Sequence, residues 1–101
     1  MYQCNMTASL KQLEKTAKAL GDVNRLQILQ FLAQQGGSGP CSAILGCLHL
    51  AQPSVSHHLK ILTEAGLITA QKEGRNFTYT LQPAAFKDYI QGISFGIPDP
   101  E

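Results

Sequence analysis

Long apolar runs and a basic leader are both missing from this sequence. No stretch approaches the ~18 consecutive apolar residues that a membrane span requires. The segment from Met1 to Asn5 carries no basic residues ahead of an apolar run, so no secretory signal is visible. Three cysteines is an odd number, which argues against a disulfide-stabilised scaffold. We therefore expect a cytoplasmic protein with no membrane partner.

An excess of charge of one sign is missing as well. Eight Lys and Arg residues stand against seven Asp and Glu residues, which gives a net charge of +1. Residues 8–25 are locally basic, whereas residues 83–101 are locally acidic. Affinity for nucleic acid would therefore have to come from a few well-placed cations and from their duplication in an oligomer.

The length and composition indicate one folded domain over residues 1–101. The chain has 101 residues, of which 44% are hydrophobic, so it can form a core. A domain of this size usually lacks room for an enclosed active site, which favours a binding module over an enzyme. We expect residues 1–7 and 96–101 to be flexible ends of the domain.

The first part of the chain predicts two helices. Apolar residues recur at three- and four-residue steps over residues 8–20, and Gly21 ends this amphipathic helix. Asp22 can cap a second helix over residues 23–35, which is apolar on most sides and is expected in the middle of the core. The glycine-rich segment at residues 36–40 breaks the pattern.

Two short helices then follow with a brief connector between them. The first covers residues 41–48, the connector residues 49–52, and the second residues 53–65. Pro53 suits the first turn of a helix, where its missing N–H costs nothing. The pattern is typical of a helix-turn-helix. The inward stripe of its second helix is formed by Val55, Leu59 and Leu62.

The remaining chain predicts a β-hairpin and a last helix. Residues 67–72 and 77–81 are β-prone, and the polar, glycine-containing segment 73–76 suits a hairpin tip. Residues 84–95 form an apolar-faced helix after Pro83. The predicted fold class is therefore mainly α with a β-hairpin, namely a winged helix-turn-helix with the hairpin as the wing.

The outward face of the helix over residues 53–65 is the candidate DNA-reading surface. In a helix-turn-helix this face enters the major groove, and its N-terminal residues reach base edges. Short hydrogen-bonding side chains gather at that end, whereas the lysine lies further along and suits a phosphate; the connector glutamine can read adenine or hold a phosphate. The predicted contacts are Gln52, Ser54, Ser56, His57 and Lys60.

The wing adds further candidate contacts. Arg75 lies at the predicted hairpin tip beside Asn76, with Lys72 behind it. An arginine on a wing can enter the minor groove, where negative potential is concentrated. Polar residues on a helix exterior are usually only solvated, and so are many turn arginines. The hairpin directly after the helix-turn-helix is what favours DNA binding over that simpler interpretation.

Four motifs in this order carry a resemblance to a known family. They read ALGDVNRLQIL at residues 19–29, QPSVSHHLKIL at 52–62, AGLI at 65–68, and EGRN at 73–76 followed by Tyr79. Together they resemble the ArsR/SmtB family of bacterial winged-helix repressors, and the match extends from residue 8 to about residue 95. The resemblance implies a homodimer that binds a two-fold symmetric operator in double-stranded DNA and releases it when an effector binds. It also implies that the first and last helices form the dimer interface.

The resemblance does not identify the effector. Many relatives sense metals or metalloids through a Cys-x-Cys pair, whose two positions fall here on Pro40 and Ser42, with Cys41 between them. Others use Asp, His and Glu on the last helix, but no histidine follows His58 in this chain. No metal can therefore be named. We expect His58 to be a packing residue at a helix boundary and assign only His57 to DNA.

Three interpretations of the cysteines stay open. In the first interpretation, Cys41 and Cys47 are small buried residues, as free cysteines commonly are. Alternatively, Cys41 lies at a helix N-terminus, where the dipole lowers the thiol pKa and favours redox or sulfide sensing. In the third interpretation, Cys41 joins Cys4 of the same or the partner subunit to bind a soft metal or metalloid. The candidate effector thiols are Cys4, Cys41 and Cys47.

Two other functions compete with a DNA-binding repressor. A winged helix can serve as a protein-interaction module without DNA binding, since fold does not fix function, and the low net charge is the best support for it. A thiol enzyme would need a histidine base near Cys41 and an oxyanion site, and nothing in the sequence marks either. We therefore expect no enzymatic activity.

Overall fold

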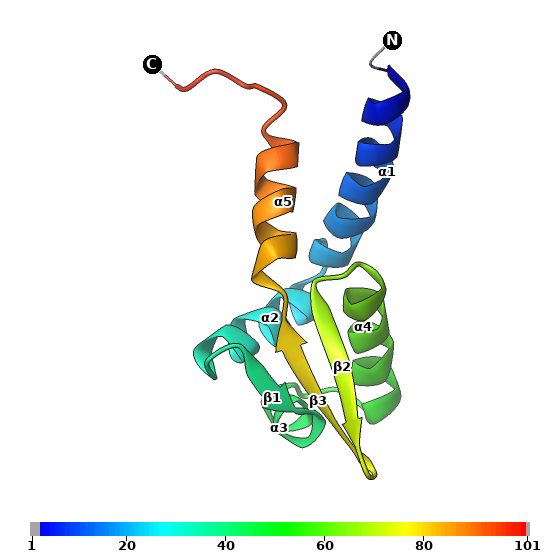
Figure 1. Ribbon diagram of the computed structural model, residues 1–101. Coiled ribbons are helices and arrows are strands. Elements are labelled where there is room, and N and C mark those ends of the chain that lie inside the picture. Colours follow the sequence, from blue (N-terminus) through cyan, green and yellow to red (C-terminus); the bar gives the residue numbers. More distant parts are fainter. Residues whose placement is uncertain (1–2, 101) are drawn as a thin grey trace.

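The computed structural model describes the backbone of residues 3–100 and the side chains from residue 10 onward. The elements follow the order expected of a winged helix-turn-helix, with one additional short strand between the second and third helices (Figure 1). The elements are α1 (Gln3–Leu20), α2 (Val23–Gln34), β1 (Ser38–Pro40), α3 (Cys41–Cys47), α4 (Gln52–Glu64), β2 (Ile68–Glu73), β3 (Asn76–Leu81) and α5 (Pro83–Ile93). Among the described residues, no helix is both long and apolar enough to cross a membrane.

Two caps set where the helices begin and end. The Asp22 carboxylate accepts hydrogen bonds from the backbone amides of Asn24 at 2.9 Å and Arg25 at 3.1 Å, which confirms it as the cap of α2. Gly66 follows α4 with φ of +82°, a conformation that glycine adopts without strain. The start of α1 differs from expectation, because the helix begins at Gln3 and so includes much of the segment predicted to be flexible.

The wing is the antiparallel hairpin of β2 and β3. Its register pairs Ile68 with Leu81 and Glu73 with Asn76, and Gly74 makes the tight turn with φ of +65°. A third strand, β1, pairs with the other edge of β3, so the sheet order is β1-β3-β2. The segment at residues 36–40 is therefore not a simple break as predicted. It supplies an edge strand that lies between α2 and α3 in the chain.

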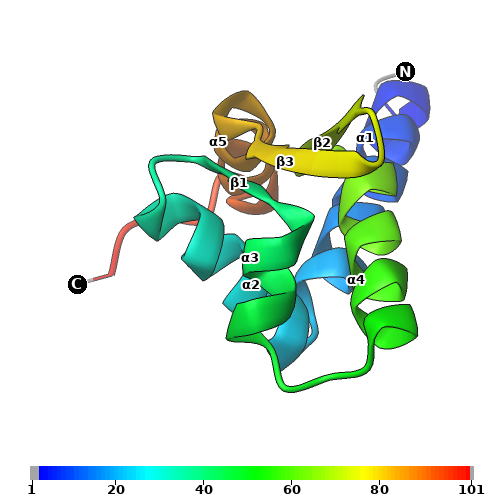
Figure 2. The same cartoon turned by 90° about the horizontal axis from the view of Figure 1, so that it is seen from below.

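The core lies between α2, α3, α4 and the sheet (Figure 2). The predicted inward stripe of α4 is confirmed, since all three of its side chains are buried. The prediction for α2 is only partly correct. Ile28 and Leu32 are fully buried, but Val23 is 74% exposed and Leu26 is 47% exposed. The helix therefore buries one face and leaves its N-terminal apolar side chains in contact with solvent.

The helices α1 and α5 project side by side from one end of the body (Figure 1). They meet closely, because a Cβ atom added at Gly92 would lie 2.9 Å from Cδ2 of Leu13. No described residue of α5 is buried, and Ile90 is 65% exposed. The pair therefore presents an uncovered apolar surface. Helix α5 ends at Ile93 rather than at residue 95, and residues 94–100 form no helix or strand.

Candidate nucleic-acid interface

The polar face of α4 is open to solvent. Its inward stripe packs on the core, which turns the intervening positions outward. All five side chains predicted to contact DNA from this segment are exposed. They are Gln52, Ser54, Ser56, His57 and Lys60.

The N-terminal end of α4 is electropositive through its backbone. Ala51 occupies the cap position without a side-chain hydrogen bond, and the amides of Ser54 and Val55 reach its carbonyl oxygen at 3.0 and 3.2 Å. The first N–H groups of a helix lack intrahelical partners and carry part of the helix dipole, which favours an anion. A phosphate group that approaches this end would therefore meet a favourable field.

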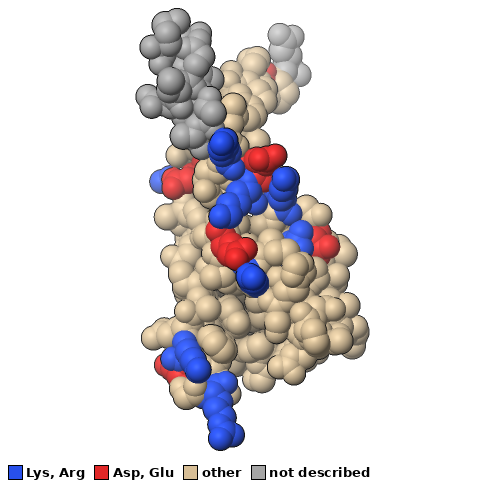
Figure 3. Space-filling view, turned by 90° about the vertical axis from the view of Figure 1, so that its right-hand side faces the viewer, with Lys and Arg blue, Asp and Glu red and all other residues tan. Residues whose placement is uncertain are grey.

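The wing carries its cations at the end of the molecule that lies away from α1 and α5. Lys72, Arg75 and Asn76 are all exposed. Lys and Arg side chains gather at this lower end and again on the upper part of the same face (Figure 3). Glu73 stands among them at the tip, so the local field comes from individual cations rather than from a broad basic patch.

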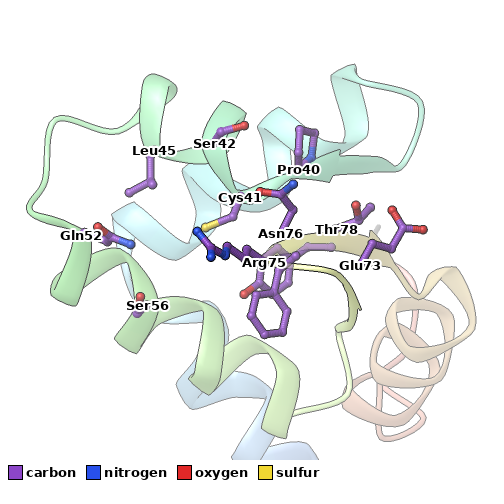
Figure 4. Close-up of a pocket in the computed structure, with 12 residues that line it drawn as sticks. Pro40, Cys41, Ser42, Leu45, Gln52, Ser56, Glu73, Arg75, Asn76 and Thr78 are labelled. Carbon is purple, nitrogen blue, oxygen red and sulfur yellow. The ribbon is translucent and has the colours of Figure 1, made fainter.

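A groove of about 630 Å³ separates the wing from α3 and the start of α4. The Arg75 side chain reaches over this groove from the wing toward α4 (Figure 4). The groove brings together four predicted DNA contacts that are distant in sequence: Gln52, Ser56, Arg75 and Asn76. The other four predicted contacts lie outside it, at Ser54, His57, Lys60 and Lys72.

The cysteines differ from the reactive thiols that one interpretation required. Cys41 begins α3, lines the groove and is partly buried. Burial raises the pKa of its thiol and also that of Cys47, so the expected lowering at the helix N-terminus is wrong. Burial, followed by the charge of Cys41, raises the pKa of neighbouring Tyr79.

A metal site is not formed by the residues that the structure describes. No cluster of three or more His, Cys, Asp or Glu side chains that could hold an ion occurs among them. The side chain of Cys4, which one interpretation paired with Cys41, lies outside the described residues.

Arg25 and His58 form a contact that the sequence did not reveal. The Nη1 atom of Arg25 lies 3.1 Å from Nδ1 of His58, whose side chain is only 13% exposed. His58 is therefore a packing residue of α4, as predicted, and points away from the polar face. The same Nδ1 atom lies 3.8 Å from the carboxylate of Asp22. The pKa of Asp22 is lowered mainly by the hydrogen bond from the Arg25 amide.

Known proteins agree with this arrangement. The family model described as bacterial regulatory protein, arsR family, matches residues 22–70. An HTH-type transcriptional regulator of Methanocaldococcus jannaschii is 46% identical over 74 residues, covering 69% of this chain and 82% of that protein. The arsenical resistance operon repressor of Staphylococcus aureus is 33% identical over 91 residues, covering 85% of this chain and 81% of that protein. The chain belongs to the ArsR family of bacterial regulatory proteins.

A solved structure supports the same assignment. The solution NMR structure of a homodimeric winged helix-turn-helix DNA-binding domain from Mycobacterium bovis matches with a TM-score of 0.70 and 29% identity. The match covers 89% of this chain and 83% of the Mycobacterium bovis chain. This ArsR-family protein is thus a winged helix-turn-helix transcriptional regulator and not an enzyme, as the sequence predicted. The alternative of an interaction module without DNA binding gains no support.

Proposed function

We propose that the protein is a homodimeric repressor that binds a two-fold symmetric operator through α4 and the wing. The observation that carries the proposal is the groove, where α4 and the wing present polar and cationic side chains on one surface. That surface lies at the end away from α1 and α5 (Figure 1), so dimerisation through those helices leaves it open to a duplex.

The proposed roles follow from where each side chain lies. Ser54, Ser56 and His57 reach base edges in the major groove, because the N-terminal part of α4 enters it first. Arg75 enters the adjacent minor groove, where the negative potential is strongest. The remaining contacts hold the sugar-phosphate backbone and fix the register. These are Gln52, Lys60, Lys72 and Asn76.

Dimerisation is proposed through α1 and α5. Apolar side chains of these helices, such as Leu10 at 48% and Ile90 at 65% exposure, have no cover within the described chain. A two-fold axis through this surface would place the two α4 helices about one DNA turn apart, roughly 34–36 Å. The two wings would then double the few cations that one chain supplies.

The effector step is proposed to depend on thiols. The Staphylococcus aureus relative is named as an arsenical resistance repressor, but this chain has Pro40 and Ser42 where many relatives have the Cys-x-Cys pair. Cys41 lines the protein groove between the wing and α4, so a ligand or modification on its sulfur would compete with DNA for this surface. Titration of operator release with zinc, arsenite, peroxide and polysulfide tests this step. Release that is unchanged in Cys4→Ser, Cys41→Ser and Cys47→Ser would exclude the thiols.

The salt dependence of duplex binding tests the DNA-binding role. We expect operator affinity to fall steeply with salt, because phosphate contacts release counterions. Arg75→Ala should weaken all duplexes about equally and reduce the salt slope by about one unit. Lys18→Ala is the control, since it removes one positive charge from a side chain that is 76% exposed and lies away from the groove. The proposal fails when the parent binds duplexes weakly and independently of salt, or when both variants behave alike.

A further inference from the structure

One partly buried arginine connects three helices, α1, α2 and α4. The Nε atom of Arg25, on α2, donates to the carbonyl oxygen of Ala19 at 2.7 Å, and Nη2 donates to that of Lys18 at 3.0 Å. Both carbonyls belong to the last turn of α1. The third nitrogen, Nη1, lies 3.1 Å from His58 on α4. One side chain therefore connects the end of α1 with the middle of α4.

The chemistry of this contact suits a rigid link. The last carbonyls of a helix have no intrahelical partner, and a guanidinium group offers several donors in a fixed plane. With Nε and Nη2 on the two carbonyls, Nη1 is the nitrogen of Arg25 that meets His58 on α4. The Nδ1 atom of His58 accepts from Arg25 when the ring proton is on Nε2.

The contact adds a polar constraint on the rotation of α4 to that of its buried stripe, Val55, Leu59 and Leu62. His57 and His58 are adjacent and therefore project about 100° apart around the helix. Their ring centroids lie 6.0 Å apart, with His57 exposed and His58 largely buried. A rotation that moves His58 away from Arg25 must therefore also turn His57 and its polar neighbours away from their position beside the groove.

We propose that Arg25 is a positioning residue that sets the orientation of α4 relative to α1 by way of His58. The inference rests on the proposed function, since it takes α4 as the DNA-reading helix and α1 as part of the dimer surface. In the dimer, the orientation of α4 in each subunit therefore depends, through Arg25 and His58, on the position of α1 in the same subunit. Its loss lets α4 rotate and weakens base readout more than phosphate contact.

The test compares substitutions that keep the acceptor with those that remove it. His58→Asn retains an oxygen acceptor near the position of Nδ1, whereas His58→Leu removes it at similar volume. We expect His58→Leu and Arg25→Met to lower the ratio of operator to non-specific affinity about tenfold or more. His58→Asn should retain most of the ratio that the parent shows. Lys18→Met is the matched control, since it removes a neighbouring charge from a side chain that is 76% exposed.

A purely structural role predicts a different result. Each variant is first measured at a temperature where circular dichroism shows it fully folded, so that a loss of stability does not enter the affinity ratio. Residual dipolar couplings of backbone amides then give the angle between α1 and α4 without DNA. A changed angle or a wider range of angles in His58→Leu and Arg25→Met, with the parent angle in His58→Asn, supports the proposal.

The two proposals fail in distinguishable ways. A parent protein that does not prefer any operator contradicts the proposed function, and the dipolar couplings alone then judge the link between α1 and α4. A parent that binds operator while His58→Leu keeps its affinity ratio and its helix angle overturns the positioning role only. An equal loss in His58→Asn and His58→Leu also overturns it, since the acceptor would then be irrelevant.

Discussion

The Asp22 carboxylate accepts hydrogen bonds from two amides at the start of α2 and faces His58 at 3.8 Å. The hydrogen bond from the Arg25 amide is the largest cause that lowers its pKa below the ordinary 3.8, with burial opposing and the charges of Arg25 and His58 assisting. Because the folded-state pKa is depressed, the ionised carboxylate stabilises the fold above the ordinary pKa. This contribution is lost as the pH falls through the folded-state value.

The substitution Asp22→Asn separates the cap from the charge. Asparagine caps helices about as well as aspartate, so the variant should keep α2 but lose the acid-dependent part of the stability. We expect parent and variant to converge as the pH falls below 3.8 and to differ at neutral pH. Urea unfolding from neutral pH down to about pH 3 measures this difference. A constant difference across that range would show that the charge contributes nothing.

Single residues also mark the limit of prediction from the sequence. The cap at Asp22 follows from local chemistry and was predicted correctly. The partnership of Arg25 with His58 joins positions that are 33 residues apart, and no local pattern signals it. Only one of the three interpretations of Cys41 expected a lowered pKa, because its place at a helix N-terminus is visible in the sequence, whereas the burial that raises the pKa depends on tertiary packing.

At the scale of elements, the sequence predicts the helices and strands whose local apolar pattern is sufficient to define them. The apolar stripe of α4 and the β-prone composition of β3 predict two elements of the candidate site. Strand β1 was missed because Ser38-Gly39-Pro40 has the composition of a loop and becomes a strand only by pairing with β3, at Gly39 opposite Tyr79. The solvent exposure of Val23 escaped prediction for the same reason, since pattern gives apolar faces but not what covers them.

Two helical glycines provide a matched test of how closely elements pack. An added Cβ atom at Gly46, on α3, would meet nothing within 4 Å, whereas at Gly92, on α5, it would meet Leu13 of α1 at 2.9 Å. Gly46→Ala should raise the free energy of unfolding by about 0.5–1 kcal/mol, because alanine loses less backbone entropy in a helix. Gly92→Ala should raise it less, since Leu13 has to move. Chemical denaturation measures both, and equal gains would mean that α1 and α5 pack loosely.

At the scale of the whole molecule, the proposed functions occupy opposite ends. The uncovered apolar surface of α1 and α5 lies at one end, and the tip of the wing lies at the other (Figure 1). The sequence predicted this division only through the family resemblance, because the placement of α5 against α1 depends on contacts between the two ends of the chain. With a net charge of +1, one chain has little excess positive charge, so we expect tight DNA binding to require two copies.

A charge placed on the apolar end should therefore separate dimerisation from DNA contact. Ile90 is 65% exposed within one chain, so Ile90→Glu should leave the fold intact while it disrupts a dimer formed through α5. Val23→Glu is the control, since it adds the same charge at a residue of α2 that is 74% exposed. Sedimentation should show a dimer for the parent and for Val23→Glu, but a monomer for Ile90→Glu.

The same variants then test whether the dimer binds two half-sites at once and therefore depends on the spacing between them. Monomeric Ile90→Glu should bind a single half-site like the parent but lose the gain that the parent obtains from two half-sites about one helical turn apart. Insertion of about half a turn between the half-sites should weaken the parent and leave Ile90→Glu unchanged. Equal sensitivity of both proteins to that insertion would place the dimer contact elsewhere than α5, and a monomeric parent would contradict symmetric binding altogether.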